Sequence, residues 1–431
     1  MKNCINLIDG KRCCGKCAAN ANILDAYTNL HPIVCDRGGN LGIAIDIGTT
    51  TLAFELLDME TGVRLAVHST VNNQNKFGAD VISRIKFAND GHLAKLNACI
   101  AEDICAGIKH ILKGRSACEI SLVAIAGNTT MLHILQNLSC NTLGASPFVP
   151  VSIDSKIESV EKILGNNLLN CNAIILPGIS AFVGADITAG LLLAGWPNTQ
   201  GHNLLVDLGT NGEMAIFSQD KIVVTSAAAG PAFEAANISC GVGCIAGAIA
   251  EVNFLHQSNV FSYETIGKAN PIGVCGTGVV DICAELIRHK LVDETGLITS
   301  GDDKIHITSS IYFTQRDIRE VQLAKSAVRS GIEILLDTAG LKYNDLANVF
   351  IAGGFGHKIK IKNAIALGLI PQELKHKVIA LGNASLGGCA MVLQSKNCES
   401  TIKELVAKST EINLAGHPNF GDYFMKYMGM E

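Results

Sequence analysis

Two short segments, far apart in the chain, share one pattern: an apolar run ends at an aspartate and is followed by a turn of glycine with hydroxyl or amide side chains. The clearer one is LLVDLGTNGE at residues 204–213, where the run leads into Asp207. The weaker copy, IAIDIGTTT at residues 43–51, leads into Asp46. Such a run favours a buried strand, and the glycine allows a tight, hairpin-like turn. Each segment is therefore predicted to be a strand that feeds a turn able to close on a ligand.

Both turns carry the groups that bind phosphate. Glycine brings backbone N–H groups close to a ligand, and hydroxyl and amide side chains can point at an anion. An aspartate at the start of each turn suits a hydrated Mg²⁺ ion. One such turn is weak evidence, but two in one chain predict a cleft in which both grip a single metal–nucleotide. The candidate ligands are Gly48, Thr49, Thr50, Gly209, Thr210, Asn211 and Gly212, with Asp46 and Asp207 beside the metal.

The chain of 431 residues is long enough for two or three domains. We expect a Cys-rich segment at residues 1–40, a first lobe at residues 41–200 and a second lobe at residues 201–431. A net charge of −5, without a basic cluster interleaved with aromatic residues, argues against a nucleic-acid or membrane partner. No run of about 18 uncharged apolar residues occurs, and the N-terminus lacks an apolar signal core. A cytoplasmic protein with reduced thiols is therefore expected.

The cysteines are unevenly distributed. Of the 16 in the chain, most stand singly in apolar or glycine-rich segments, which favours small buried residues. The N-terminal segment differs, because Cys14 and Cys17 form a C-x2-C pair, Cys35 follows after 17 residues, and Cys4 or Cys13 could supply a fourth thiolate. This set suits an iron–sulfur cluster or zinc, and thiols without a metal are a third interpretation. A redox dithiol is less favoured, because no thioredoxin-like pattern surrounds the pair.

The order of predicted strands and helices repeats along the chain. In the first part, strands at residues 43–47, 52–57 and 63–67 are followed by helices at residues 79–87 and 94–113. The second part begins with the run at residues 204–206, continues with strands at residues 214–217 and 221–224, and later has a long amphipathic helix at residues 319–340. Two lobes of one plan indicate an internal duplication. The expected fold class is α/β, with two duplicated lobes around a cleft.

Three further glycine-rich turns stand beside predicted helices or strands. One follows a strand at residues 121–125, one precedes a helix at residues 279–290, and one follows a strand at residues 349–351. A strand that runs through such a turn into a helix leaves N–H groups facing a cleft. Paired glycines also let a flat ring lie on the backbone. The candidate ligand contacts in these turns are Gly127, Asn128, Gly276, Thr277, Gly278, Gly353, Gly354 and Phe355.

Two other features have an ordinary interpretation beside a functional one. In NQNKFGADVISRI at residues 73–85, the side chains of Asn73, Gln74 and Arg84 either line a cleft or belong to a loop and the start of a helix with Asp80 in its first turn. His133 stands in an apolar helical stretch, where a satisfied core residue is favoured over a ligand.

Taken in order, the two Asp turns, the two connecting glycine motifs and the Gly-Gly segment resemble the fold shared by sugar kinases, actin and the heat-shock chaperones. Five elements occur in the order found in that family, spread over about 310 residues, and this makes the resemblance specific. The resemblance implies two actin/hexokinase-like (ribonuclease-H-like) lobes. It also implies that the Asp turns hold the β- and γ-phosphates of ATP and Mg²⁺, and that the Gly-Gly segment packs on adenosine.

Longer passages are similar to one branch of that superfamily, the ATP-dependent reductive activators of corrinoid proteins. The matching stretches are FGADVISRI, AGNTTMLHIL, PFVPV, LPGISAFVGADITAGLL, VDLGTNGE, AAAGPAFEAANISCG, GVCGTGVVDI, IAGGFG and LGNASLGG. The resemblance implies return of a corrinoid protein of a methyltransferase system from Co(II) to Co(I). Cys14 and Cys17 resemble the middle ligands of the family's plant-type [2Fe-2S] loop and Cys35 the last, whereas no cysteine stands near Ile8, where the first would fall.

The family likeness also suggests roles and partners. Glu213 directly follows the phosphate turn and is the first candidate for positioning the attacking water, with Glu234 as the second. A homodimer and an external electron donor are expected. Three alternatives on the same fold stay open: an activator of an acyl-CoA dehydratase, a small-molecule kinase with Asp186 or Asp281 as its base, and a non-catalytic, ATP-driven switch that binds a partner.

Overall fold

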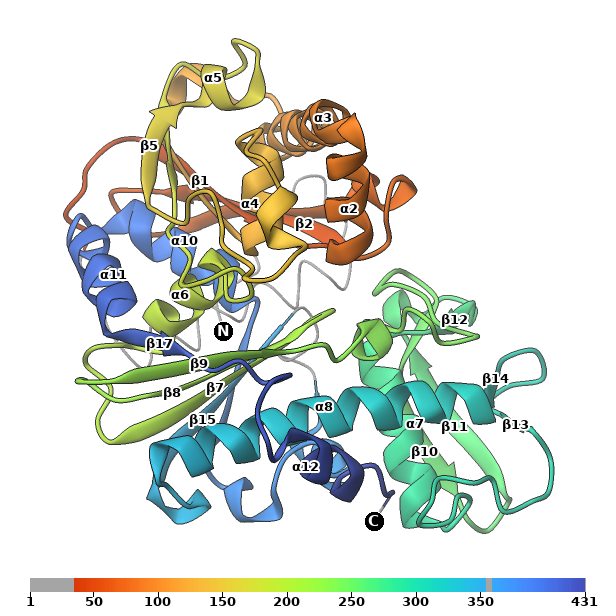
Figure 1. Ribbon diagram of the computed structural model, residues 1–431. Coiled ribbons are helices and arrows are strands. Elements are labelled where there is room, and N and C mark those ends of the chain that lie inside the picture. Colours follow the sequence, from red (N-terminus) through yellow and green to blue (C-terminus); the bar gives the residue numbers. More distant parts are fainter. Residues whose placement is uncertain (1–34, 354–358, 431) are drawn as a thin grey trace.

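The computed structural model describes residues 35–353 and 359–430. Within these residues, two six-stranded sheets form the centres of two lobes, and helices lie between the sheets and on their outer faces (Figure 1). A three-stranded sheet and a two-stranded hairpin lie at one end of the second lobe. The fold is thus α/β with two lobes, as the sequence predicts.

The first sheet has the strand order β3-β2-β1-β4-β6-β5. Strand β1 pairs antiparallel with β2 and parallel with β4, so a meander of hairpins continues into a parallel layer. The strands are β1 (Leu41–Ile47), β2 (Thr51–Asp58), β3 (Arg64–Val71), β4 (Ile120–Gly127), β5 (Lys156–Ser159) and β6 (Asn172–Ile175).

The second sheet, with the order β16-β15-β7-β8-β9-β17, repeats this plan. Strand β7 pairs antiparallel with β8 and parallel with β15, as β1 does with β2 and β4. The strands are β7 (His202–Leu208), β8 (Gly212–Phe217), β9 (Ile222–Ala227), β15 (Leu346–Ala352), β16 (Val378–Gly382) and β17 (Ser409–Glu411). The matching strand orders are those expected of an internal duplication.

Three helices lie between the two sheets: α6 (Ala185–Leu193), α10 (Ala384–Gln394) and α11 (Asn397–Lys408) (Figure 1). Helices α6 and α10 are buried along nearly their whole length, because both their sides face protein. One continuous apolar core joins the first sheet, these helices and one face of the second sheet, which contributes Leu205, Phe217 and Phe350. Residues 384–405, late in the sequence, therefore complete the core of the first lobe.

The opposite face of the second sheet, with Leu204 and Val206, packs in a second core against α8 (Gln315–Ala339). Burial of both faces explains the unbroken apolar run before Asp207. The other helices are α2 (Val81–Phe87), α3 (Leu93–Leu112), α4 (Thr129–Leu135), α5 (Val160–Leu164), α7 (Gly276–Arg288), α9 (Ile361–Ala366) and α12 (Phe420–Lys426).

The remaining elements are short. The small sheets contain β10 (Ala248–Leu255), β11 (Val260–Thr265), β12 (Gly273–Val274), β13 (Lys304–His306) and β14 (Tyr312–Thr314). Single turns of helix are η1 (Asn73–Lys76), η2 (Ala88–His92), η3 (Ala117–Glu119), η4 (Asn141–Leu143), η5 (Pro231–Glu234), η6 (Ile266–Lys268), η7 (Tyr343–Asp345) and η8 (Gln372–Leu374). Among the described residues, none of the helices is long and apolar enough to cross a membrane.

Candidate functional site

A cavity of about 250 Å³ opens where the two lobes meet, and residues of both lobes line it. Asp46, at the end of β1, and Asp207, at the end of β7, both face it. The two aspartates hold equivalent places, because Asp46 pairs in register with Ala126 of β4 and Asp207 with Ala352 of β15. The structure thus brings the two turns, predicted from the sequence as a pair, to one cavity.

Most of the other sequence-predicted ligands that the structure describes lie in the wall of this cavity. They come from both Asp turns, from the turn before α4, from the start of α7 and from the end of β15. These residues are Gly48, Thr49, Thr50, Asn128, Gly209, Thr210, Asn211, Gly276, Thr277 and Gly353, and the carboxylates Glu213 and Glu234 also line it. Gly354 and Phe355 lie outside the described residues, so the predicted contact of that segment with adenosine stays a prediction.

Three predicted ligand contacts, Gly127, Gly212 and Gly278, lie behind the cavity wall and do not line it. A Cβ atom at Gly127 would clash with the carbonyl oxygen of Ile47, and one at Gly278 with that of Ile249. At Gly212 the clash would be with a methyl group of Val328. These glycines are needed where backbone packs closely on its neighbours, a requirement that looks the same in sequence as close approach to a ligand.

The two turns are in direct contact. The Thr50 and Thr210 hydroxyl oxygens lie 3.5 Å apart. Thr210 donates a hydrogen bond of 2.6 Å to Oε2 of Glu234, and Thr50 donates a longer one of 3.4 Å to the same oxygen. Glu234 stands at the end of η5, in the second lobe. A hydroxyl from the first lobe is therefore tied to a hydroxyl and a carboxylate of the second.

Asp46 is held by two side chains that the sequence analysis did not single out as ligands. Asn383 donates from Nδ2 to one carboxylate oxygen and Ser385 from Oγ to the other, each at 2.7 Å. The Asn383 side chain also caps α10 by accepting from the N–H of Leu386. The internal duplication could have predicted this contact. Helices α6 and α10 each follow the third parallel strand of their sheet, and both begin at the cavity.

Asp186 is the second residue of α6, as Ser385 is the second residue of α10, and it also lines the cavity. Burial, followed by the nearby negative charge of Asp46, raises the pKa of Asp186 to about 7. Burial also raises the pKa of Asp46, against the hydrogen bonds from Ser385 and Asn383. Crowded carboxyls in a low-dielectric site disfavour their charged forms.

Glu213 lies directly across the β7–β8 hairpin from Asp207, its partner in register. Burial and the charges of Asp186 and Asp207 raise the pKa of Glu213, whereas a hydrogen bond from the Asn211 side chain lowers it. Burial and the charges of Asp186, Asp46 and Glu234 likewise raise the pKa of Asp207. In the first lobe the place of Glu213 is taken by Ala53, which pairs with Asp46. The site therefore has this carboxylate on one side only.

The donor set fits a hydrated divalent cation. Five carboxyl groups line the cavity, whereas in the described part of the chain no lysine or arginine does so. Those described residues contain no group of three or more Cys, His, Asp or Glu side chains placed to bind a metal ion directly. Mg²⁺ keeps several water ligands and is commonly held by one or two carboxylates together with phosphate oxygens. Asp46 and Asp207 suit this kind of site.

Asn73, Gln74 and Arg84 do not line the cavity, and their place decides between the two interpretations of that segment. Arg84 is fully buried and donates to the carbonyl of Thr49 at 2.6 Å and to that of Gly78 at 2.9 Å. Burial lowers the pKa of Arg84 to about 10. The segment is thus a capped loop and helix that supports the first Asp turn from behind.

His133 is a satisfied core residue, as predicted. It is buried, its Nδ1 lies 2.8 Å from the carbonyl oxygen of Thr129, and its Nε2 accepts a hydrogen bond from the N–H of Val151. Burial lowers the pKa of the imidazole, which favours the neutral ring that this arrangement uses.

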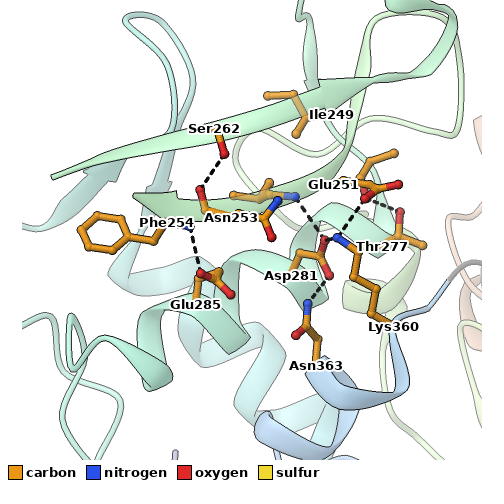
Figure 2. A network of polar contacts seen from close by, with 12 residues as sticks. Ile249, Glu251, Asn253, Phe254, Ser262, Thr277, Asp281, Glu285, Lys360 and Asn363 are labelled. Carbon is orange, nitrogen blue, oxygen red and sulfur yellow. Dashed lines mark hydrogen bonds and ion pairs between the residues drawn. The ribbon is translucent and has the colours of Figure 1, made fainter. Parts of the chain in front are cut away.

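A second polar network stands behind the wall formed by Thr277 (Figure 2). Asp281 of α7 is buried and accepts from Lys360 Nζ at 2.8 Å, from Asn363 Nδ2 at 2.5 Å and from the N–H of Val252. Lys360 also pairs with Glu251 of β10 at 3.0 Å. Asp281 is therefore committed to joining α7, α9 and β10. It does not line the cavity, which removes it as a candidate catalytic base.

The N-terminal metal site is not described by the structure. Cys4, Cys14 and Cys17 lie outside the described residues. Cys35 is half-buried, with its sulfur 4.0 Å from Oε1 of Gln394 at the end of α10, and burial raises the pKa of its thiol. A cluster bound by these four cysteines stays a prediction.

The repeated sheets, the helices between them and a cleft with an aspartate turn on each side place the protein in the nucleotide-binding superfamily of sugar kinases, actin and the heat-shock chaperones. Residues 201–431 match the family model described as the C-terminal domain of RACo, the ASKHA domain, and residues 41–198 match the RACo middle region. The chain belongs to the RACo family, which confirms the resemblance predicted from its motifs.

Three proteins similar to this chain have names that refer to the activation or reduction of corrinoid proteins. The chain is 34% identical over 448 residues to the corrinoid activation enzyme RamQ of Eubacterium limosum, with 93% of this chain and 74% of that protein covered. It is 26% identical over 415 residues to the [Co(II) methylated amine-specific corrinoid protein] reductase of Methanosarcina barkeri, with 89% and 76% covered. A solved reductive activator for a corrinoid, iron–sulfur protein matches with a TM-score of 0.84 at 31% identity, and covers 91% of this chain. The chain spans 66% of that protein's length.

Proposed function

We propose that this protein binds ATP with Mg²⁺ between its lobes and uses the nucleotide to drive reductive activation of a corrinoid protein, from Co(II) to Co(I), in a methyltransferase system. The observation that carries the proposal is the meeting of Asp46 and Asp207 at one cavity in a chain of the RACo family. The named relatives, a corrinoid activation enzyme and a corrinoid protein reductase, support the choice of substrate.

The cavity residues divide the work of nucleotide binding. Asp46 and Asp207 would hold a hydrated Mg²⁺ ion, which would supply positive charge to neutralise phosphate oxygens. The hydroxyl groups of Thr49, Thr50 and Thr210 and the amide of Asn211 bind phosphate oxygens from the two sides. Gly276 and Thr277 belong to the wall that accepts the nucleoside, together with Gly353.

Glu213 is the better candidate for positioning the attacking water. Glu234 accepts hydrogen bonds from Thr210 and Thr50, so its carboxylate is already engaged in holding the two turns together. Glu213 faces the same cavity beside Asp207. We assign the positioning role to Glu213 and a bridging role to Glu234.

Coupling to cobalt reduction is conformational in this proposal. A nucleotide held by both turns favours one relative position of the lobes, and the corrinoid protein binds that state with an affinity different from its affinity for the other. Only such a difference can shift the cobalt environment. Hydrolysis of ATP then lets the lobes return to their other relative position. Electrons come from an external donor. Cys4, Cys14, Cys17 and Cys35 would hold an N-terminal [2Fe-2S] cluster, which would supply one-electron transfer chemistry. A homodimer in the cytoplasm, where ATP is available, is also part of the proposal.

The test uses anaerobically purified protein, a corrinoid protein in the Co(II) state and titanium(III) citrate as the electron source. We expect the Co(I) absorption spectrum to appear only with MgATP, and ATP hydrolysis to rise when the corrinoid protein is added. The Asp207→Asn variant should show neither effect. Corrinoid reduction that proceeds equally well without ATP, or in the Asp207→Asn variant, would overturn the proposal. A visible and electron-paramagnetic spectrum of the same sample tests the cluster separately.

A further inference from the structure

Two cysteines share one wall of the cavity. Cys275 is the N-cap residue of α7, and Cys244 lies in the glycine-rich loop that precedes β10. Both line the cavity, beside Gly276 and Thr277. Neither is disulfide-bonded in the structure. None of the roles assigned above to phosphate, metal or water uses these thiols.

Most of the polar groups around Cys275 favour its thiolate, whereas the carbonyl oxygen of Ile249, 3.3 Å from the sulfur, accepts a hydrogen bond from the protonated thiol. The Cys244 thiol donates a hydrogen bond to the Cys275 sulfur, the hydroxyl of Thr277 lies 3.5 Å away, and the N–H groups of Thr277 and Gly278 face the sulfur from the first turn of the 13-residue helix. The hydrogen bond from Cys244 is the largest of these effects, and together they outweigh burial and lower the pKa of Cys275 to about 6. The N-terminus of a helix stabilises a negatively charged thiolate, and the thiolate is the reactive form of cysteine.

Nearby cysteines show that this arrangement is particular to the pair. Cys283, two turns further along α7, is fully buried, and burial raises the pKa of its thiol. Burial likewise raises the pKa of Cys240, at the other end of the loop that carries Cys244, to about 12. A neutral buried thiol is chemically inert. Proximity to α7 alone therefore does not produce a reactive sulfur.

We propose that Cys275 and Cys244 form a peroxide-reactive thiol pair inside the cleft, with Cys275 as the nucleophile and Cys244 as the resolving residue, and that nucleotide binding and disulfide formation exclude each other. The existence of the pair is independent of the function proposed above. The exclusion rests on that function, because it requires the nucleotide to lie in this cavity.

The reaction has two steps. The Cys275 thiolate attacks one oxygen of hydrogen peroxide, so an S–O bond forms, the O–O bond breaks and hydroxide leaves, taking up a proton to become water. The Cys244 sulfur then attacks the sulfenic sulfur of Cys275, forming the S–S bond and releasing the hydroxyl group as a second water with the Cys244 proton. Two thiols lose two electrons and two protons in total, and one peroxide becomes two waters.

The geometry explains why the two states compete. A disulfide holds its Cα atoms about 4.4–6.8 Å apart, which fixes the loop of Cys244 against the start of α7. With the loop fixed there, less space is left in the cavity beside Gly276 and Thr277. In the other direction, a nucleotide lying on this wall covers the buried Cys275 sulfur and blocks the approach of peroxide.

The test treats the full chain, purified anaerobically, with hydrogen peroxide and maps the alkylated peptides by mass spectrometry. We expect a peptide linked through Cys244 and Cys275 to form several-fold faster than oxidation of the exposed Cys118. In Cys244→Ser the reaction should stop at a sulfenic acid on Cys275 that dimedone traps. Cys275→Ser should give neither product, and serine is a favourable residue at the N-cap position of α7. Cys118→Ser is the matched control and should leave the yield of the linked peptide unchanged.

Two results would overturn the pair: no linked peptide in the wild-type chain, or the same rate of oxidation at Cys275 in a chain unfolded by urea. Prior addition of MgATP should slow formation of the linked peptide several-fold and leave Cys118 unaffected. A linked peptide that forms equally fast with saturating MgATP supports the thiol pair but overturns the exclusion. If direct calorimetry then shows no MgATP binding to the reduced protein, the failure belongs to the proposed function.

Discussion

The hydroxyl groups of Thr50 and Thr210 lie 3.5 Å apart, although 160 positions separate the two residues in the chain, and both donate to Glu234. The contact joins the turn of the first lobe to that of the second through side chains alone. Because the same hydroxyls are the proposed phosphate ligands, a nucleotide would have to replace or rearrange these bonds as it binds. The link is thus both a brace and part of the site.

A double-mutant cycle with Thr50→Val and Thr210→Val tests this brace. Valine keeps the shape of the side chain and removes the hydroxyl, so each single variant should unfold at a lower urea concentration. Because the two hydroxyls share Glu234, we expect the double variant to lose less than the sum, with a coupling free energy of about 1 kcal/mol. Measured unfolding midpoints supply the values. Additive losses would show that the two turns do not stabilise each other.

Replacing Asp207 by asparagine should have opposite effects on binding and on stability. Loss of a charged group at the metal weakens MgATP binding about ten- to a hundredfold, which calorimetry would measure. The unliganded protein should unfold at a higher temperature, because one of the crowded carboxyls that raise each other's pKa values is gone. Asp46→Asn should weaken MgATP binding in the same way, but it also alters the bonds from Asn383 and Ser385. An Asp207→Asn protein that binds MgATP as the wild type does would remove the metal role.

The stability of the unliganded protein should fall as the pH rises from about 5 to about 7.5. Asp186 has a pKa of about 7 in the folded chain, against the ordinary value of 3.8. The folded state therefore holds this proton more tightly than the unfolded state. The resulting stability is complete below the ordinary pKa and is lost as the pH passes through the raised one. In Asp186→Asn, melting temperatures measured across this range should fall less steeply.

Saturating MgATP should reverse that trend, since binding of a cation favours the charged carboxyls. The stabilisation by MgATP, measured as the shift in melting temperature, is expected to grow between about pH 5 and pH 7.5. A shift that stays constant over this range would contradict a cation held among these carboxyl groups.

The network around Asp281 should contribute to stability. Lys360→Met leaves a buried carboxylate with Asn363 and one N–H as its partners. We expect a loss of about 2 kcal/mol, less than for a fully buried pair because the Lys360 side chain is 26% exposed. Lys162→Met, which breaks a surface pair with Glu158, is the matched control and should leave the free energy of unfolding nearly unchanged. Equal unfolding free energies for the two variants would show that the network is only a surface feature.

The sequence predicts the strand-and-turn parts of the fold well. Asp46 and Asp207 each end an apolar run, and the run is apolar because the strand is buried on both faces. The repeated order of hairpins and helices indicates the duplication, and the duplication implies that the two turns face each other. Local chemistry and periodicity were sufficient here.

The contacts across the cleft were harder to predict. Asn383 and Ser385 bind Asp46, more than 330 positions away, and no local pattern distinguishes them from ordinary helix-capping residues. Helices α6 and α10 are apolar on nearly all sides, so their sequences do not show which face meets which lobe. Glycines are equally ambiguous, since Gly127 serves packing and Gly276 lines the cavity.

The placement of α10 and α11 has a consequence for how the chain matures. Their residues 384–405 fill the interior beneath the first sheet, whose strands leave the ribosome some 200 residues earlier. The first lobe therefore cannot complete its core, and keeps apolar surface exposed, until nearly the whole polypeptide has been synthesised. A fragment that stops at residue 200 should aggregate, and a chaperone that shields nascent chains would be needed longest over that lobe.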